Sequence, residues 1–411
     1  MLKSQSSARW QIAFMVCCAI AISYFDRQTL PVAVAAMQRD IPMSNIDYST
    51  LQSMFLVAYA VMYAVGGRFI DLVGSRAGFA AVMIWWSAAC ASHGFARSVS
   101  FLAVSRLLLG VGKGGAFPAA TKVVSSWFQP QDRATAMGII NAGTAVGAVL
   151  APPAIAAIIL NLNWHWVFFF AGLSGIVWTA WWLTAYREPT HFPQTVHAES
   201  VGWLRLLSHS QVWGLVVAKF LSDAAWYFYL FWLPKYLYDA RGFDTRKVGY
   251  YAWIPYAASG AGCLVGGWFS SWLLQQGKRS LTFSRRLALG LSAAVMPSVL
   301  LVTQVRVELA IVIFSIAFFG QQSWSTLVMT LPADLFPNRT VASVAGMVGF
   351  GGAIGGLVFG QLAGYLLDHG YGYGTVFAIA GSLHVIAFGV LLLAVPKVEP
   401  LFVEESLKAA L

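Results

Sequence analysis

Long apolar runs separated by short polar segments dominate this chain of 411 residues. A helix needs about 20 apolar residues to cross the hydrocarbon core of a bilayer. Runs of about that length recur twelve times, which predicts an all-α membrane protein with twelve transmembrane helices. The expected spans are residues 10–36, 49–73, 77–96, 99–122, 134–160, 165–186, 210–238, 248–274, 284–304, 307–331, 341–367 and 373–396.

The longest polar interval divides these spans into six and six. We therefore expect an N-terminal half of residues 1–186, a cytoplasmic linker of residues 187–209 and a C-terminal half of residues 210–411. The halves also resemble each other: FQPQDRATAMGIINAGTAVGAVLAP follows the fourth span, and LFPNRTVASVAGMVGFGGAIGGLVFG follows the tenth. Parallel repeats of six spans are typical of transporters that bind substrate near the membrane midplane and work by alternating access.

The composition agrees with a membrane protein. Charged residues make up 10% of the chain and hydrophobic ones 58%, whereas soluble proteins carry about 25% charged residues. The formal net charge of +10 comes from Lys and Arg residues scattered between apolar runs, so we expect a lipid bilayer and no nucleic acid as partner. With the N-terminus inside, the inner segments hold about twice as many Lys and Arg residues as the outer ones, which predicts that both termini are cytoplasmic.

Residues for metal or enzyme chemistry are sparse. Cys17, Cys18, Cys90 and Cys263 all lie in apolar runs without metal-site or disulfide spacing. The glycine-rich stretch GVGKGG lacks the Ser or Thr that follows the lysine of a phosphate-binding loop. The histidines are scattered and no nucleophile constellation is visible, which argues against a membrane enzyme or a sensor. We expect no catalytic residue, no metal and no cofactor, with an ion gradient as the energy source.

The loop after the second span, GGRFIDLVGSRAGF, resembles the signature loop of the major facilitator superfamily. Gly67, Asp71, Gly74 and Arg76 fit its pattern of Gly-x-x-x-Asp-x-x-Gly-x-basic. Glycine permits a tight turn between helices, and the aspartate and arginine can join one helix end to a neighbour. The equivalent stretch of the second half, GGWFSSWLLQQGKRS, has no aspartate, so we expect a weaker latch there.

Charges inside the predicted spans are the strongest functional signal. Asp26, Arg27, Arg106 and Lys113 lie deep in the first and fourth spans, where each charge costs about 2.5–3.5 kcal/mol. Arg106 and Lys113 are almost two helical turns apart and share a face. Three positive charges and one negative charge suit a bound carboxylate, which arginine holds in bidentate geometry. An ion cluster that only joins the two spans is the alternative.

Three further charges lie in or near spans. Asp223 is either a proton site or a structural acid near the inner end of its helix. The long side chains of Lys122 and Lys219 are expected to extend to the cytoplasmic interface.

Several stretches resemble the anion:cation symporter family, which takes up organic anions including sugar acids. These are ISYFDRQTL, SRLLLGVGKGGAFPAATKVVSSWF and NAGTAVGAVLAPP. Three others, AKFLSDAAWYFYLFWLPKYL, YYAWIPYAASG and TLPADLFPNRTVASVAG, are most similar to its bacterial hexuronate transporters. The resemblance implies a proton-coupled symporter of the bacterial inner membrane that imports a hexuronate or related sugar acid. We expect it to act as a monomer.

The resemblance also implies roles for residues of the first half. Asp26 matches the acid that takes the proton, and Arg27 and Arg106 match arginines of the anion site. The other expected substrate contacts here are Tyr24, Tyr59, Asn141 and Thr144.

Lys113 departs from the family, because many relatives have a glutamate there. Lys113 either pairs with Asp26 or anchors a more highly charged anion, and Asp223 becomes a second candidate for proton coupling. This departure motivates an alternative function, namely an exchanger or ion-coupled carrier of an aromatic acid or a dicarboxylate.

The second half contributes polar and aromatic side chains suited to a hydroxyl-rich substrate. Gln and Ser bind hydroxyl groups, and aromatic faces stack on the C–H face of a sugar. Each of these residues taken alone is also explained by core packing. The expected substrate contacts are Trp226, Tyr227, Gln321, Gln322, Ser323, Trp324 and His384.

Overall fold

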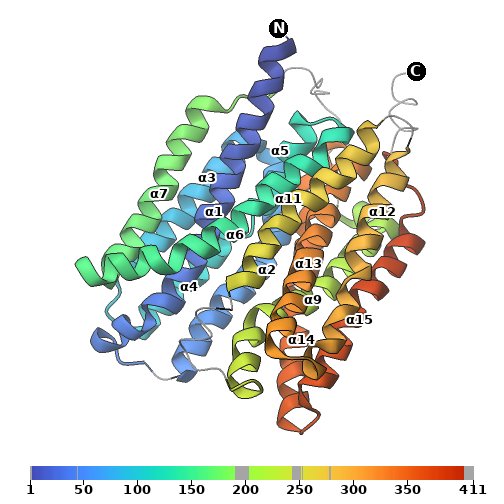
Figure 1. Cartoon of the computed structure of the whole chain (residues 1–411). Helices are drawn as coiled ribbons and strands as arrows, with labels where there is room; N and C mark the ends of the chain where they lie inside the picture. The colour runs from blue at the N-terminus through green and yellow to red at the C-terminus, as the bar shows by residue number, and fades with distance from the viewer. Residues whose placement is uncertain are drawn as a thin grey trace. The chain divides into compact units, whose positions relative to one another are not determined.

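The computed structural model describes residues 2–43, 45–189, 203–242, 251, 253–276 and 279–401, and their regular structure is entirely helical (Figure 1). Helices suit a membrane because each satisfies its own backbone hydrogen bonds. The elements are α1 (Leu2–Asp40), α2 (Asn45–Val73), α3 (Ser75–Ser92), η1 (His93–Phe95), α4 (Val99–Lys113), α5 (Ala116–Trp127), α6 (Pro130–Asn161), α7 (Trp164–Ala185), α8 (Trp203–Leu207), α9 (Ser210–Asp239), α11 (Trp253–Gln275), α12 (Leu281–Ala294), η2 (Met296–Gln304), α13 (Val307–Leu335), α14 (Asn338–Asp368) and α15 (Gly372–Ala394).

Each of the twelve predicted spans coincides with one helix or a consecutive pair. The fourth span is the pair α4 and α5, interrupted at Gly114 and Gly115, because glycine is a poor helix former. The ninth is α12 followed by η2, a 3₁₀ helix that begins next to Pro297. Within the described ranges, nine segments are long and apolar enough to cross a membrane, and α3, α9 and α11 are not among them. Residues 190–202 of the expected linker and residues 248–250 and 252 of the eighth span lie outside the described residues.

Contacts between Cα atoms divide the chain into two compact units. Unit 1 comprises Met1–Trp127, Gly143–Val201 and Asn338–Met347, and unit 2 comprises Phe128–Ala142, Gly202–Pro337 and Val348–Leu411. The helices that contain the two similar stretches, α6 and α14, each contribute one end to each unit. The domain boundaries expected from the polar interval remain a prediction.

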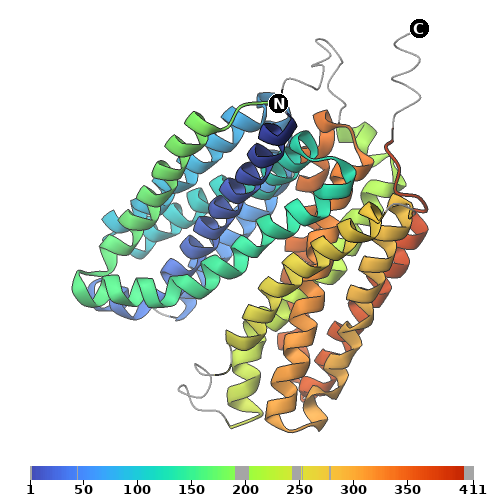
Figure 2. The ribbon, with the colours of Figure 1, turned by 45° about the horizontal axis from the view of Figure 1, so that its top comes forward.

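In unit 1, α2 packs on α4, α3 on α7, and α1 on α7 and α5 (Figure 2). Two glycines permit the close packing of α2 on α4. A Cβ atom added at Gly110 would collide with the carbonyl oxygen of Phe55, and one at Gly114 would collide with the backbone of Met62. Small residues at such contacts let helix backbones approach each other in a membrane. The polar side chains of α4 therefore lie close to α2.

In unit 2, α11 packs on α13, and α9 packs on α15. Aromatic side chains fill the core between these helices. The ring of Phe377 on α15 lies 5.1 Å from Tyr236, 5.5 Å from Phe228 and 5.5 Å from Phe314, all with tilted or perpendicular rings. Edge-to-face packing of this kind is favourable for aromatic pairs. It holds α9 and α13 in place beside the polar residues of unit 2.

Candidate functional site

The signature loop joins helix ends of unit 1. Asp71 accepts hydrogen bonds from the backbone N–H of Ser343 (2.7 Å), the Ser343 hydroxyl (2.6 Å) and the backbone N–H of Ala342 (3.3 Å). The carboxylate therefore binds the second turn of α14, which begins at Asn338, and joins the loop to the N-terminal part of that helix. Gly67 has no Cβ that would strike Ala342, and Gly74 (φ 90°) forms the turn before α3.

Two cations support this loop. Lys122 on α5 forms an ion pair with Asp71 at 3.1 Å and also donates to the carbonyl oxygen of Ile70. The lysine is buried, and its expected extension to the cytoplasmic interface stays a prediction. Arg76 donates to the carbonyl oxygen of Leu183 at 2.6 Å, which joins the start of α3 to α7.

The acid of the first span is paired with a lysine. Asp26 on α1 is fully buried, and its Oδ2 lies 3.7 Å from Nζ of Lys113 at the end of α4. Lys113 is buried too and donates to the carbonyl oxygen of Ser23 at 2.6 Å. Of the two roles expected for Lys113, the structure places it against Asp26.

Arg106 lies on α4 two turns before this lysine. Its guanidinium carbon is 5.9 Å from the ring of Phe55, and the side chain is 1% exposed. Its Nε and Nη2 atoms are sealed from solvent and form no hydrogen bond with the residues that the structure describes. A buried donor without an acceptor is costly and rare in folded proteins, so these two donor atoms of Arg106 are unusual for a buried side chain.

Arg27 is half-buried and surrounded by aromatic rings. Its guanidinium carbon lies 5.0 Å from the ring of Tyr24, 5.1 Å from Tyr59 and 5.6 Å from Phe55. Aromatic faces stabilise a cation while leaving its N–H groups directed sideways. Phe55 contacts both guanidiniums, and Asp26 lies close to Arg106 as well as to Lys113. One cluster within unit 1 therefore contains the two arginines, both tyrosines, Asp26 and Lys113. We call it the cation cluster.

Sequence reasoning missed three neighbours of this cluster. Phe55 lies one helical turn before Tyr59, a spacing that points to a shared face. Trp86 and Cys90 of α3 are fully buried and lie near Asp26. An isolated aromatic or cysteine residue in an apolar run carries no signal of its own. Thr144 is buried in α6, and no hydrogen bond among the described residues joins it to the cation cluster.

Unit 2 contains a second buried pair of an aspartate and a lysine. Lys219 donates to Asp223 one turn later on α9 (2.9 Å) and to the Ser325 hydroxyl of α13 (2.8 Å). The expectation that Lys219 extends to the cytoplasmic interface is therefore wrong. Gln321 of α13 forms a hydrogen bond with His384 of α15. We call these five residues the unit 2 polar cluster.

The other expected contacts of unit 2 lie around this cluster in varied settings. Trp324 is fully buried and packs edge-on against His384 at 5.7 Å. Trp226 packs edge-on against Phe318 at 5.3 Å, and Tyr227 packs on the bare backbone of Gly356. The remaining three are polar: Asn141 donates to Thr326 (3.1 Å), Gln322 accepts from Cys263 (3.8 Å) and Ser323 packs on Gly266.

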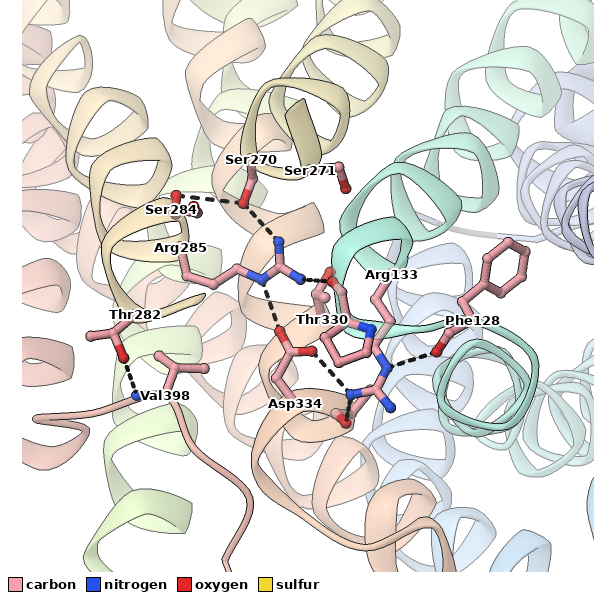
Figure 3. Close-up of polar contacts among 12 residues, drawn as sticks. Phe128, Arg133, Ser270, Ser271, Thr282, Ser284, Arg285, Thr330, Asp334 and Val398 are labelled. Carbon is pink, nitrogen blue, oxygen red and sulfur yellow. Dashed lines mark hydrogen bonds and ion pairs between the residues drawn. The ribbon is translucent and has the colours of Figure 1, made fainter. Parts of the chain in front are cut away.

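An ion network at the end of α13 was not predicted (Figure 3). Asp334 forms ion pairs with Arg133 on α6 (3.1 Å) and with Arg285 on α12 (2.8 Å). Arg285 is fully buried and also donates to the Ser270 hydroxyl and the carbonyl oxygen of Pro130. Ser270 lies in the stretch that lacks the signature aspartate, and Asp334 supplies an acid to this end of unit 2.

Comparison with known proteins identifies relatives over most of the chain. The sequence model of the Major Facilitator Superfamily matches residues 16–360. A hexuronate transporter of Escherichia coli (strain K12) is 28% identical over 394 residues, which cover 90% of each chain. A galacturonate transporter of Dickeya chrysanthemi is 28% identical over 306 residues, which cover 70% of this chain and 89% of that protein.

A solved structure shows the same fold. The proton:xylose symporter of the major facilitator superfamily, bound to 6-bromo-6-deoxy-D-glucose, has a TM-score of 0.73 and 15% sequence identity, covering 98% of this chain and 99% of that one. This likeness confirms the predicted major facilitator fold. The named relatives are transporters, in agreement with the expectation of a transporter and not an enzyme.

Proposed function

This chain belongs to the Major Facilitator Superfamily, and we propose that it imports a sugar acid together with protons across the bacterial inner membrane, with both termini in the cytoplasm. Relatives named as hexuronate and galacturonate transporters support a hexuronate as the substrate. In this proposal the transporting species is a single chain that works by alternating access. In this proposal the proton gradient is the energy source, and the transporter needs no cofactor.

The two unpartnered donor atoms of Arg106, Nε and Nη2, are the observation that carries the proposal. A carboxylate accepts two parallel hydrogen bonds from one guanidinium, and such charge-assisted bonds are about twice as strong as neutral ones. Arg27 adds a second positive charge to the same cluster, and its aromatic surroundings hold it in position. Tyr24 and Tyr59 border this charge and suit the apolar face of a sugar ring.

Asp26 provides the coupling to protons. An ionised Asp26 repels a bound carboxylate and competes with it for the cations of the cluster. Protonation removes this repulsion and releases Lys113 from its ion pair. Proton and anion then each favour the binding of the other, and this reciprocal coupling is what a symporter requires.

Uptake of labelled galacturonate into proteoliposomes under an imposed inward proton gradient tests the proposal. Arg106→Ala should reduce uptake to the level of empty liposomes, because it removes both unpartnered donors. Arg97→Ala is the matched control, since Arg97 is an exposed arginine of the same unit. Wild-type protein that takes up no galacturonate, or an Arg106→Ala variant with unchanged affinity, would contradict the proposal.

A second candidate follows from Lys113, a cation beside Asp26 within the cluster. Its charge favours a more acidic substrate, such as a dicarboxylate or an aromatic acid, carried by exchange or with another ion. Competition against labelled galacturonate by a panel of such acids separates the two. Transport of these acids without any transport of galacturonate would favour this second candidate.

A further inference from the structure

The Lys219–Asp223 pair of unit 2 lies within one helix. The two residues are four positions apart on α9, so their side chains meet on one face, with Nζ 2.9 Å from Oδ1. Both side chains are buried, with 7% of the lysine and 12% of the aspartate exposed. A pair on a single helix keeps its geometry when that helix moves as a body. The distance between the two charges is therefore set within α9.

Three other helices of unit 2 enclose the pair. From α13, Ser325 accepts a bond from Lys219, and Gln321 interacts with Asp223. From α14, Gly352 presents bare backbone, because a Cβ atom there would collide with Oδ2 of Asp223. From α15, His384 is the titratable group that faces the pair within the described residues, and it interacts electrostatically with Lys219.

The histidine is connected to the aspartate through one amide. The Gln321 oxygen only accepts, so His384 donates to it from Nε2. The amide nitrogen of Gln321 is then directed to Asp223. The other ring nitrogen of His384, Nδ1, is sealed and has no hydrogen-bond partner among the residues described. A neutral histidine, an amide and a carboxylate thus form a short polar chain that ends at the ion pair.

Two other acids inside the described helices are held more firmly. Asp71 accepts from two backbone N–H groups, a hydroxyl and a lysine, and Asp334 is bound by two arginines. Asp26 and Asp223 each have one lysine as their ion-pair partner. Removing the negative charge of an acid held by several donors leaves those donors unpaired in the interior, which is costly. A proton added to Asp223 leaves one ammonium group that Ser325 still binds.

We propose that Asp223 and Lys219 form a second proton-exchange site, in which protonation of Asp223 frees the Lys219 ammonium to stabilise an anion. The aspartate carboxylate gains the proton and becomes neutral, and the pair changes from zero net charge to one positive charge. The role in transport rests on the proposed function, and it means that two protons accompany each monovalent sugar acid, one at Asp26 and one at Asp223.

Infrared difference spectroscopy of the purified protein tests the proton site without any substrate. On acidification, the wild type should gain carboxylic acid C=O bands, one of which is absent in Asp223→Asn, retained in Asp26→Asn and present at a shifted position in Asp223→Glu. A spectrum unchanged by Asp223→Asn overturns the proposal. This measurement contains no substrate, so its result is valid even if galacturonate is not transported. A failure of the proton-site proposal can therefore be distinguished from a failure of the proposed function.

The number of protons is measured from the pH gradient that balances a tenfold galacturonate gradient at zero membrane potential. Two protons require about half a pH unit and one proton requires about one pH unit. We expect about half a unit for the wild type and about one unit for Asp223→Asn. If Asp223→Asn is poorly folded, the wild type alone is measured. Its proton uptake on galacturonate binding is obtained by calorimetry in two buffers of different ionisation enthalpy. One proton per galacturonate in the wild type overturns the two-proton scheme.

Discussion

The partner of each buried charge in this protein determines its energetic cost and its ability to bind a proton. The Asp26–Lys113 pair joins α1 to α4, and both side chains are completely shielded from solvent. Attraction between two buried charges roughly offsets their lost hydration, but one such charge left alone is strongly unfavourable. The folded unit therefore depends on both partners being present, and a single proton changes the net charge of the pair.

A thermal unfolding cycle checks this balance. Lys113→Met leaves an uncompensated carboxylate and should destabilise the purified protein by about 3–5 kcal/mol. Asp26→Asn combined with Lys113→Met removes both charges and should recover most of that loss. If the double variant is no more stable than Lys113→Met alone, the two residues are not energetically coupled in the way that their 3.7 Å separation indicates.

Helices were the most predictable level of this protein. Each predicted span coincides with a helix or helix pair, because a long apolar run in a bilayer has few alternatives to a helix. The cation cluster was also predictable, since its charges stand out in apolar surroundings. The ion pairs of Asp334 with Arg133 and Arg285 could not be predicted, because contacts between distant spans leave no local sequence pattern. For Lys219 the signal was present, as an acid lies four residues later on the same helix.

Close packing of α2 on α4 sets the position of Arg106, and substitution of one glycine at this contact tests that statement. In Gly110→Ala the new methyl group collides with Phe55 and lies 2.9 Å from the Cβ of Ala58. Overpacking of this kind costs about 1–3 kcal/mol, so we expect a lower Tm and weaker galacturonate binding. Gly389→Ala is the matched control, because nothing lies within 4 Å of its added Cβ, and it should be neutral or slightly stabilising. Equal effects of both substitutions would contradict the packing argument.

At the scale of the whole molecule, four of the buried acids divide into two classes. Asp71 and Asp334 join helix ends within unit 1 and unit 2 respectively, and each has several strong donors. Asp26 and Asp223 lie one in each unit and are each paired with a lysine. The first class suits permanent cross-links and the second suits sites whose charge changes during a transport cycle. If transport is coupled to protons as proposed, we expect the second class alone to carry that coupling, because its acids are the ones whose charge can change.

Asp26→Asn separates this energy coupling from movement of the substrate. The asparagine imitates the protonated aspartate, so the cation cluster stays ready for the anion at every pH. We expect the variant to exchange internal for external galacturonate at a rate within about tenfold of the wild type, while accumulation driven by a pH gradient is lost. Counterflow and gradient-driven uptake in the same proteoliposomes measure the two activities. Full accumulation by Asp26→Asn would transfer the coupling to Asp223, whereas loss of both activities would mean that the ionised Asp26 is needed for binding or for the conformational cycle itself.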